Sequence, residues 1–537
     1  MSISSLLLAS VLAAIPLTLI LAAIPAGWRS RRVSLTEQQR WRFAWLAASI
    51  VAVLTGTAIA LSLWLPEQPS AWLSHQPLRL TLLVLLSVMA LVIVRFSRRY
   101  LASDPGFGRY LRWLLLTLAA VALVFISNHL LLFALGWIAI SLALHQLLMF
   151  YPERPRAALA AHKKFLLARL AETSLLVAFY LLWQQHGTAN IDTIISAYQA
   201  PAALSLNEQL AAVLLALTAL IKCAQLPVHG WLIQVVEAPT PVSALLHAGV
   251  INLGGFLLIL FAPLFLQVPA AQWLVLVVAG LTTLLAALIM TTRISVKVRL
   301  AWSTSAQMGL MLIECAAGMV ELALLHLLAH SAYKAWAFLS SGAAVQQHIQ
   351  QSLLVSPAPG LRDWWLALLP AALIVTLAAM ASVLLHPAGQ MLSGWLLVLL
   401  ALTALLAQSR AGLISTLLLS TSLVLAYSLL KTLMQPLSGG LAAELRPPLL
   451  GTIDLWLTSL FALLFALAWL LRWRRHWPLV QRLAQTLFAG LYLDEWFTRM
   501  TLRLWPARLP LRANPKQLST ASSNTLIAAE GRKEQCL

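Results

Sequence analysis

The sequence has few charged residues and few cysteines for its length. Only 10% of its 537 residues are charged and 61% are hydrophobic, whereas a soluble domain is about a quarter charged. Its three cysteines form no CxxC pair and no run that could hold an iron–sulfur cluster. It also has no glycine-rich nucleotide-binding loop and no nucleophile elbow. We therefore expect no cofactor, no metal and no covalent chemistry in this chain, and we predict that it is not an enzyme.

Long apolar runs dominate the sequence instead. Runs of about 20 residues, the length of helix that crosses a bilayer, recur from Leu6 almost to Leu471. We count about fifteen of them, which predicts an all-α polytopic membrane protein whose integral domain covers residues 1–475. The first run, 5–26, lacks a convincing cleavage site and is expected to be retained.

The basic residues follow a topological pattern. The net charge of +19, from 36 Lys plus Arg against 17 Asp plus Glu, would suggest a nucleic-acid partner in a soluble chain. Here the opposing loops at 67–75 and 184–207 are poor in basic residues, so we expect a lipid bilayer and no nucleic acid. The positive-inside rule places the N-terminus outside and the C-terminus in the cytoplasm. The basic clusters are 29–42, 95–112, 154–164, 293–299, Arg410 and 472–475.

Two proline-containing segments interrupt the helical pattern. Pro227 follows Leu226 in the middle of a span, where it removes a backbone donor and is expected to break the helix. Broken helices mark transport sites in membrane proteins. The run EAPTPV at 237–242 ends one helical piece and opens the next, with Thr240 available as its N-cap.

The C-terminal part has a different composition from the spans. Residues 478–506 mix apolar, aromatic and Arg residues at helical spacing. This pattern predicts an interfacial amphipathic segment, which could dock a partner. Residues 508–537 have the composition of a disordered tail.

Ionisable residues inside the apolar runs are the strongest functional signal, because a charge at mid-bilayer is costly. Lys222 lies five residues before Pro227, where its ammonium would meet freed carbonyl groups and could exchange protons. The alternative is a lysine that snorkels to the membrane surface. His247 has small neighbours that allow close helix approach, and a neutral imidazole there can relay a proton. The alternative is a hydrogen-bonded core histidine.

Three further ionisable residues share one predicted helix. His326, His330 and Lys334 are spaced four and four, which places them along a single stripe. Such a stripe is typical of a proton-conducting path. The alternatives are packing or zinc binding, but the glutamate of an HExxH motif is absent and carboxylate ligands are scarce.

The remaining candidates are carboxylates and one lysine. Glu172 follows Arg169 by three residues, so it could exchange protons with the central lysine or form a structural ion pair with Arg169. Glu237 could lie at the junction of the broken helix, and Lys297 could bridge two halves of the protein. Glu314 has no evident partner in the sequence.

From about residue 79 to 345 the chain resembles the antiporter-like subunits of respiratory complex I and of multisubunit cation/proton antiporters. The resemblance implies two inverted five-helix repeats with broken helices, roughly 112–265 and 270–410. It also implies a central proton-handling role for Lys222, a relay through His247, His326, His330 and Lys334, and a bridging role for Lys297. It rests on YLASDPGFGRYLRW at 100–113, SNHLLLFALGW at 127–137, IKCAQLPVHGWL at 221–232, EAPTPVSALLHAG at 237–249, KVRLAWSTSAQMG at 297–309 and HLLAHSAYKAWAFLSSG at 326–342.

The chain departs from that family at two places. Where the family usually has LGWE, this sequence has LGWI, so Ile138 replaces the glutamate that tunes the central lysine. The second broken-helix region, 364–386, has no lysine of the FFSKDE type. The second half-channel of a complex I subunit is therefore predicted to be incomplete.

These departures, with AGLYLDEWFTRMTLRLWP at 489–506, resemble the DabB subunits of inorganic carbon accumulation systems. That resemblance implies a multi-pass protein of the bacterial inner membrane that conducts protons or Na⁺. It would couple the ion gradient to CO₂/bicarbonate uptake by a DabA-like partner, a large cytoplasmic zinc protein. The alternatives are a proton-pumping subunit of a quinone-linked oxidoreductase and a cation/proton antiporter subunit.

Overall fold

The computed structural model describes residues 3–27, 35–64, 71–201, 203–344, 346, 349–350, 359–385, 391–408, 413–438, 451–474 and 476–505. These residues form helices joined by short connections, and the only β structure among them is two isolated bridges. The predicted tail at 508–537 lies outside the described residues. The prediction of an all-α chain is confirmed for the described part.

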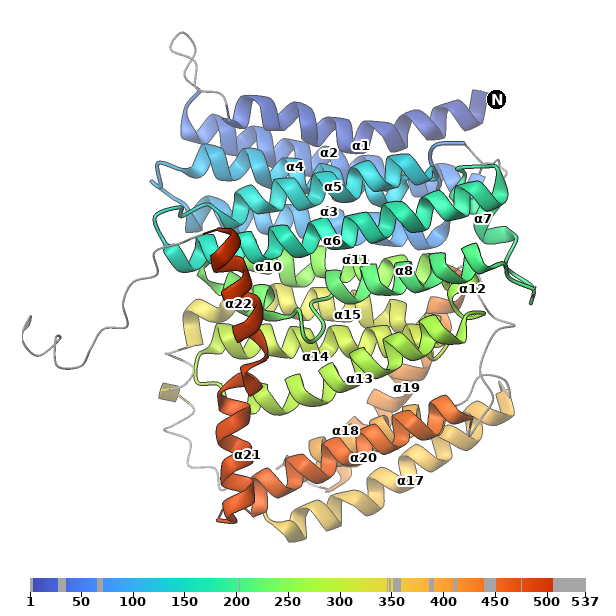
Figure 1. Cartoon of the computed structure of the whole chain (residues 1–537), viewed down its shortest axis with the longest axis vertical. Coiled ribbons are helices and arrows are strands. Elements are labelled where there is room, and N and C mark those ends of the chain that lie inside the picture. Colours follow the sequence, from blue (N-terminus) through green and yellow to red (C-terminus); the bar gives the residue numbers. More distant parts are fainter. Residues whose placement is uncertain are drawn as a thin grey trace, which may run out of the picture.

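The helices lie side by side in one elongated stack (Figure 1). The first group forms one end of the stack and is followed by a short helix, α7 (Ile191–Ser196). The first group comprises α1 (Ile3–Gly27), α2 (Glu37–Trp64), α3 (Pro77–Tyr100), α4 (Phe107–Ile126), α5 (Leu130–Leu148) and α6 (Pro155–His186).

The middle of the stack contains the interrupted helices. It comprises α8 (Leu206–Lys222), α9 (Gly230–Gln234), η1 (Val235–Glu237), α10 (Thr240–Ala248), η2 (Val250–Asn252), α11 (Leu253–Leu260), α12 (Ala262–Phe265), α13 (Pro269–Thr291), α14 (Val296–Ala316), α15 (Val320–Leu339) and η3 (Ser340–Ala343). The last group comprises α17 (Leu361–Leu385), α18 (Leu392–Gln408), α19 (Leu413–Leu437) and α20 (Thr452–Trp473).

Eleven helical segments in the described part are long and apolar enough to cross a membrane. They are α1 to α6, the α10–α11 pair, α13, α17, α19 and α20. Four more helices, α8, α14, α15 and α18, run alongside them but are shorter or more polar. The chain is therefore a multi-pass membrane protein, and the count of about fifteen spans stays a prediction that requires these four to cross as well.

The two predicted repeats correspond to two sets of helices. The range 112–265 holds α4, α5, α6, the short α7, the broken α8–α9 and α10–α11, and the short α12. The range 270–410 holds α13, α14, α15, α17 and α18, and α17 is continuous over Leu361–Leu385 where a broken helix was expected. The inverted relation between the two sets stays a prediction.

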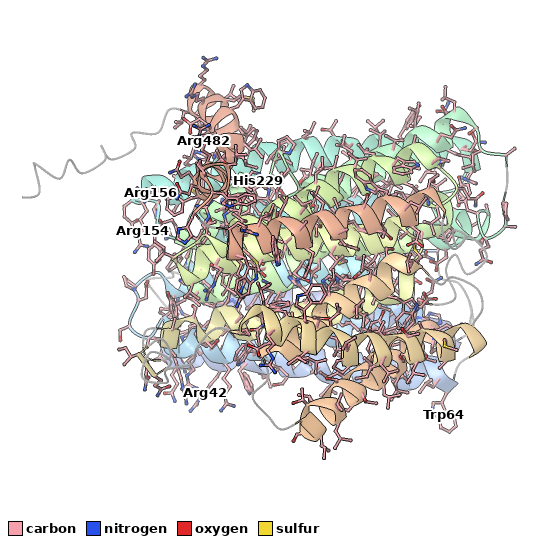
Figure 2. The ribbon with its side chains drawn as sticks, turned by 90° about the horizontal axis from the view of Figure 1, so that it is seen from below. Arg42, Trp64, Arg154, Arg156, His229 and Arg482 are labelled. Atoms are coloured by element: carbon pink, nitrogen blue, oxygen red, sulfur yellow. The ribbon has the colours of Figure 1, made fainter. Side chains whose placement is uncertain are left out.

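Basic side chains gather at one end of the helices, which we call the basic end. Arg42, Arg154, Arg156 and Arg482 lie there, whereas Trp64 lies at the opposite end (Figure 2). The N-terminus of α1 is also at the opposite end (Figure 1). If the basic end faces the cytoplasm, as the positive-inside rule requires, the N-terminus is outside.

The C-terminal helices run transverse to the spans, across the basic end and along the long direction of the stack (Figure 1). They are α21 (Pro478–Phe488), the 3₁₀ turn η5 (Gly490–Tyr492) and α22 (Leu493–Leu504). Leu479, Tyr492 and Trp496 are exposed, and Phe497 and Leu487 are buried. One face of these helices thus packs on the spans and the other stays free.

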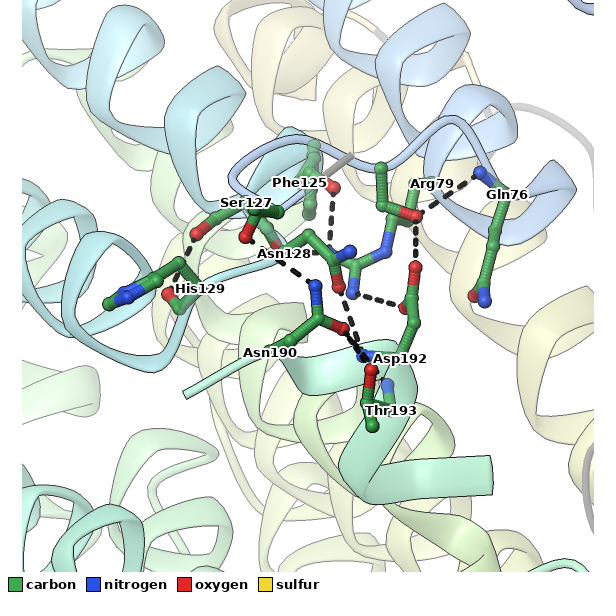
Figure 3. A network of polar contacts seen from close by, with 11 residues as sticks. Gln76, Arg79, Phe125, Ser127, Asn128, His129, Asn190, Asp192 and Thr193 are labelled. Carbon is green, nitrogen blue, oxygen red and sulfur yellow. Dashed lines mark hydrogen bonds and ion pairs between the residues drawn. The ribbon is translucent and has the colours of Figure 1, made fainter. Parts of the chain in front are cut away.

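A buried polar network closes the opposite end (Figure 3). The Arg79 guanidinium, which is fully buried, donates to the carbonyl oxygens of Phe125 at 3.3 Å and of Ser127. It also pairs with Asp192 at 3.4 Å, and the Ser74 hydroxyl donates to the same carboxylate at 2.9 Å. Because these groups come from the start of α3, the α4–α5 connection and α7, the network fixes all three to one another.

Candidate ion-translocation site

The helix that carries Lys222 ends at that residue. α8 stops at Lys222, and the chain becomes helical again only at α9, which begins at Gly230. Between them lie Ala224, in a left-handed conformation with φ of 52°, and Pro227. The predicted break is present. Because the C-terminal end of a helix carries partial negative charge, this position favours a protonated amine.

Polar side chains from neighbouring helices satisfy the backbone groups that the break exposes. The Ser305 hydroxyl of α14 donates to the Ala224 carbonyl at 3.1 Å, and the Leu226 amide donates to Thr282 of α13 at 3.0 Å. Inside a membrane, non-helical backbone is tolerated only where such partners exist. The break is therefore a built feature of the helix packing.

Lys222 lies beside a small internal cavity. Its ammonium is 4.4 Å from the ring centroid of Trp137. The cavity, of about 30 Å³, is lined by Lys222, Glu172, Lys164 and Trp137, among others. This volume has room for one or two water molecules. Two amines and a carboxylate thus share one space in which a proton could pass between them.

Glu172 supplies a carboxylate to this space from α6. It forms an ion pair with Arg169 at 2.7 Å and is 5% exposed. The ion pair with Arg169 that the sequence offered is therefore present, and Glu172 also lines the Lys222 cavity; proton exchange with Lys222 stays a prediction. Ile138 leaves α5 without the family's glutamate, so the carboxylate nearest in role comes from the next helix.

Lys164 is a member of the site that sequence reasoning did not select. It is buried and donates to the carbonyl oxygen of Ser141 at 2.6 Å, and Arg169 donates to the Ser141 hydroxyl at 2.8 Å. Its spacing of eight residues before Glu172, two helical turns, was the available signal. We call Lys222, Glu172, Lys164, Arg169, Ser141 and Trp137 the Lys222 cluster.

His247 lies in the last turn of α10 and is fully buried. Its Nδ1 is 3.1 Å from the Thr304 hydroxyl of α14, and its ring stacks on Phe338 with centroids 4.3 Å apart. Its Nε2 is buried and has no hydrogen-bond partner among the described residues. One ring nitrogen is thus oriented, and the other is free to bind or release a proton.

Lys334 is held without a carboxylate at its ammonium. Its Nζ donates to the Ser303 hydroxyl at 2.8 Å and to the Leu300 carbonyl at 3.3 Å, both on α14. No carboxylate of the described residues lies within ion-pair distance of it. Lys334 is fully buried, and the oxygen atoms that accept hydrogen bonds from its ammonium are both uncharged.

The stripe predicted on one helix continues to a buried ion pair. His330 has no hydrogen-bond partner for either ring nitrogen within the described part of the chain, and its ring lies 6.1 Å from that of His326. His326 Nδ1 contacts the Glu314 carboxylate at 3.0 Å. Glu314, unassigned from the sequence, becomes a candidate because α14 and α15 form an antiparallel pair. We call Lys334, His330, His326, Glu314, His247, Ser303 and Thr304 the Lys334 cluster.

Lys297 and Glu237 lie apart from both clusters. Lys297, in the first turn of α14, donates to the Thr240 hydroxyl at 3.0 Å. Thr240 is the first residue of α10 and does not cap it through its side chain, so that expectation was wrong. Glu237 is half-buried in η1, and no recorded bond joins it to another candidate within the described part of the chain.

The C-terminal helix α22 is anchored beside the broken helix. The Asp494 carboxylate pairs with the buried Lys163 at 2.7 Å and accepts from the Gln234 amide of α9 at 2.8 Å. Lys163 also donates to Thr498 at 2.6 Å. A side chain at Gly230 would collide with Asp494, so glycine is required for this approach. Sequence reasoning had no signal for these contacts.

No set of three His, Cys, Asp or Glu side chains in the described ranges could hold a metal ion. The pair of Glu314 and His326 therefore stands as an ion pair. The arrangement brings titratable side chains together in two places, around Lys222 and around Lys334.

The chain is similar to membrane proteins of known families. The family described as "NADH:quinone oxidoreductase/Mrp antiporter, TM" matches residues 127–363. The "Probable inorganic carbon transporter subunit DabB" of Hydrogenovibrio crunogenus is 45% identical over 494 residues, which cover 90% of this chain and 94% of that protein. The "Probable inorganic carbon transporter subunit DabB2" of Halothiobacillus neapolitanus is 37% identical over 443 residues, 80% of each protein.

A solved structure shows the same fold. The structure of the Mrp complex from a Dietzia species has a TM-score of 0.61 at 20% identity, and the match covers 100% of this chain and 63% of that one. The fold is therefore that of an Mrp-type membrane subunit. Because the match to the Hydrogenovibrio relative spans nearly the full length of both proteins at 45% identity, the chain belongs to the DabB family of membrane subunits.

Proposed function

We propose that this protein conducts protons, or Na⁺, through the membrane and thereby drives inorganic carbon uptake. The observation that carries the proposal is the pair of lysine sites among the spans, Lys222 beside a small cavity at a helix break and the fully buried Lys334 on a histidine stripe that ends in a buried carboxylate. Its relatives are named as inorganic carbon transporter subunits, which supports carbon as the cargo. The organisms of these relatives support the bacterial inner membrane as the location.

The order of the residues suggests the direction of the path. Lys222, Lys164 and Glu172 lie between α6 and α8, next to the break. On α15, Lys334 is nearest the basic end, and His330 and His326 follow toward the opposite end, where Glu314 lies in the last turn of α14. We propose that an ion moves between the Lys222 cluster and the Lys334 cluster by way of His247, and then along the stripe to Glu314. Water must complete the contacts between the clusters.

The membrane potential supplies enough energy for this coupling. One charge that crosses 100 mV releases about 2.3 kcal/mol, and about 1.4 kcal/mol changes an equilibrium constant tenfold. One ion per turnover could therefore bias the conversion of CO₂ to bicarbonate more than tenfold. We assign that chemistry to a DabA-like zinc partner in the cytoplasm, in line with the naming of the relatives as transporter subunits.

The basic end is the proposed docking surface for this partner. Helices α21 and α22 lie across it and expose Leu479, Trp496 and Glu495. We propose that the exposed face of 478–505 binds the partner. Removal of the chain from Leu479 onward is expected to release the partner while the spans still insert. Retention of the partner by this truncated chain would contradict the proposal.

The test of the function is carbon uptake by cells that carry Lys222→Ala or Lys334→Ala at normal protein level. Both variants are expected to lose uptake. Wild-type uptake in both would refute conduction through these residues. Purification of the complex separates the alternatives, because one large zinc protein supports this proposal, whereas iron–sulfur and quinone-binding subunits indicate an oxidoreductase. Co-purification with membrane subunits alone indicates a cation/proton antiporter.

A further inference from the structure

Two histidines outside the proposed path lie next to it on the basic side. His145 is in the last turn of α5, and His162 is in the second turn of α6. Their rings are 6.1 Å apart and nearly parallel. The Nδ1 atom of each is buried and has no hydrogen-bond partner among the residues that the structure describes. A buried polar atom without a partner is costly, so this pair calls for an explanation.

The pair leads into the Lys222 cluster. His145 follows Ser141 by one helical turn on α5, and Ser141 accepts the hydrogen bond from Lys164. His162 precedes Lys164 by two residues on α6. The two imidazoles therefore lie between the basic end and the lysine that borders the cavity.

An aromatic side chain next to the C-terminal helix stacks on one histidine of the pair. The ring of Trp505, which directly follows α22, stacks on His162 with centroids 4.7 Å apart and an interplanar angle of 17°. It also contacts the edge of Phe165 at 5.9 Å. Trp505 is itself 41% exposed. One aromatic ring, on the residue that follows the helix anchored by Asp494, thus lies over His162, which is itself half-buried.

We propose that His145 and His162 form the cytoplasmic mouth of the proton path and that Trp505 covers it. The inference rests on the proposed function and extends it by naming the entry residues. Imidazole binds and releases protons near neutral pH, so the pair can pass a proton between the cytoplasm and Lys164. Because Trp505 belongs to the proposed docking segment, a bound partner can change access to this mouth.

The test measures proton flux in liposomes that contain the full chain with its partner and an internal pH-sensitive dye, under an imposed potential. The double variant His145→Gln/His162→Gln is expected to lower the flux about tenfold or more. Imidazole added on the side of the basic end is expected to restore part of it. A structural pair would not respond to imidazole. Wild-type flux in the double variant, or no rescue by imidazole, would overturn the proposal that His145 and His162 form the entry to the path.

A matched control exists at the other end of the molecule. His129 also stacks on a tryptophan, Trp72, with centroids 4.2 Å apart, but it lies at the start of α5. His129→Gln is expected to leave the flux unchanged. Lys222→Ala measured beside it separates the two proposals: flux lost in Lys222→Ala but kept in the double variant refutes only the mouth, and flux kept in both refutes the conduction path.

Access under Trp505 provides a second measurement. A cysteine introduced by His162→Cys, in a Cys536→Ser background, is expected to react slowly with a membrane-impermeant thiol reagent from the basic side. Addition of Trp505→Ala is expected to raise the rate about tenfold. The two native cysteines at 223 and 315 are buried and give the background rate. Equal rates with and without Trp505 would refute its role as a cover.

Discussion

The two buried lysines are stabilised in different ways. Lys222 lies at the end of a half-helix and shares a cavity with the Glu172 carboxylate. Lys334 lies inside a continuous helix, bonded to a hydroxyl and a carbonyl, and its carboxylate, Glu314, is reached only through two histidines. We therefore propose that Lys222 exchanges a proton with Glu172 through the shared cavity, whereas Lys334 depends on the imidazoles between it and Glu314.

Removal of Lys222 is expected to have the largest effect. Lys222→Met keeps the length of the side chain but leaves no amine at the helix break, so proton flux should fall about 100-fold, as for loss of an essential proton-transfer group. The proton flux of Lys334→Met should fall by a similar factor if the two clusters act in series. Flux measured in liposomes for both variants decides this, and a large residual flux in Lys334→Met would mean that the Lys222 cluster conducts alone.

The carboxylate in the Lys222 cavity offers a sharper comparison. Glu172→Gln is expected to lower the flux about tenfold, because the cavity then holds two amines and no acid. Ile138→Glu places a carboxylate on α5, where the resembling family has one. The double variant Glu172→Gln/Ile138→Glu should recover part of the flux. Flux that stays as low as in Glu172→Gln would show that the position on α6, not the charge, is required.

The same question applies to the far end of the histidine stripe. Glu314→Gln removes the charge that His326 contacts and should lower the flux a few-fold while the stripe remains. The matched control is Glu321→Gln, a buried glutamate in the first turn of α15, the helix that carries the histidine stripe. Equal flux in wild type and Glu314→Gln, by the liposome assay, would place the ion exit elsewhere.

A smaller effect on flux is expected where α22 meets the broken helix. Gly230→Ala places a methyl group against the Asp494 carboxylate and should displace α22, so less partner co-purifies while flux changes little. Gly56→Ala in α2, where a methyl group would meet nothing within 4 Å, is the control. If Gly230→Ala retains the partner at the wild-type level, the position of α22 is not required for partner binding.

Local sequence patterns predicted much of the fold and part of the site. Spacing alone placed His326, His330 and Lys334 on one helix, and Pro227 alone indicated the break after Lys222. Each of these signals lies within a few helical turns, where geometry follows directly from residue separation.

Contacts between distant segments could not be read from the same patterns. Glu314 was missed because its partner His326 lies on the next helix, and the pair of Lys163 and Asp494 joins residues 331 positions apart. Lys164 shares a helix face with Glu172 by its spacing, but it was not chosen as a site residue because it stands in a basic cluster that positive-inside reasoning already explained. The register of packed helices decides such contacts, and one sequence does not specify it.

The adjacent residues Lys163 and Lys164 have a consequence for coupling. Lys163 pairs with Asp494 on α22, and Lys164 donates to the Ser141 carbonyl beside the cavity. Two residues adjacent in the chain therefore connect the C-terminal helix with the site. If partner binding shifts the occupancy of the cavity, thermodynamic linkage requires that occupancy shift partner affinity by the same factor. The strength of the complex should then depend on membrane voltage, and a de-energised cell should hold its partner with a different affinity.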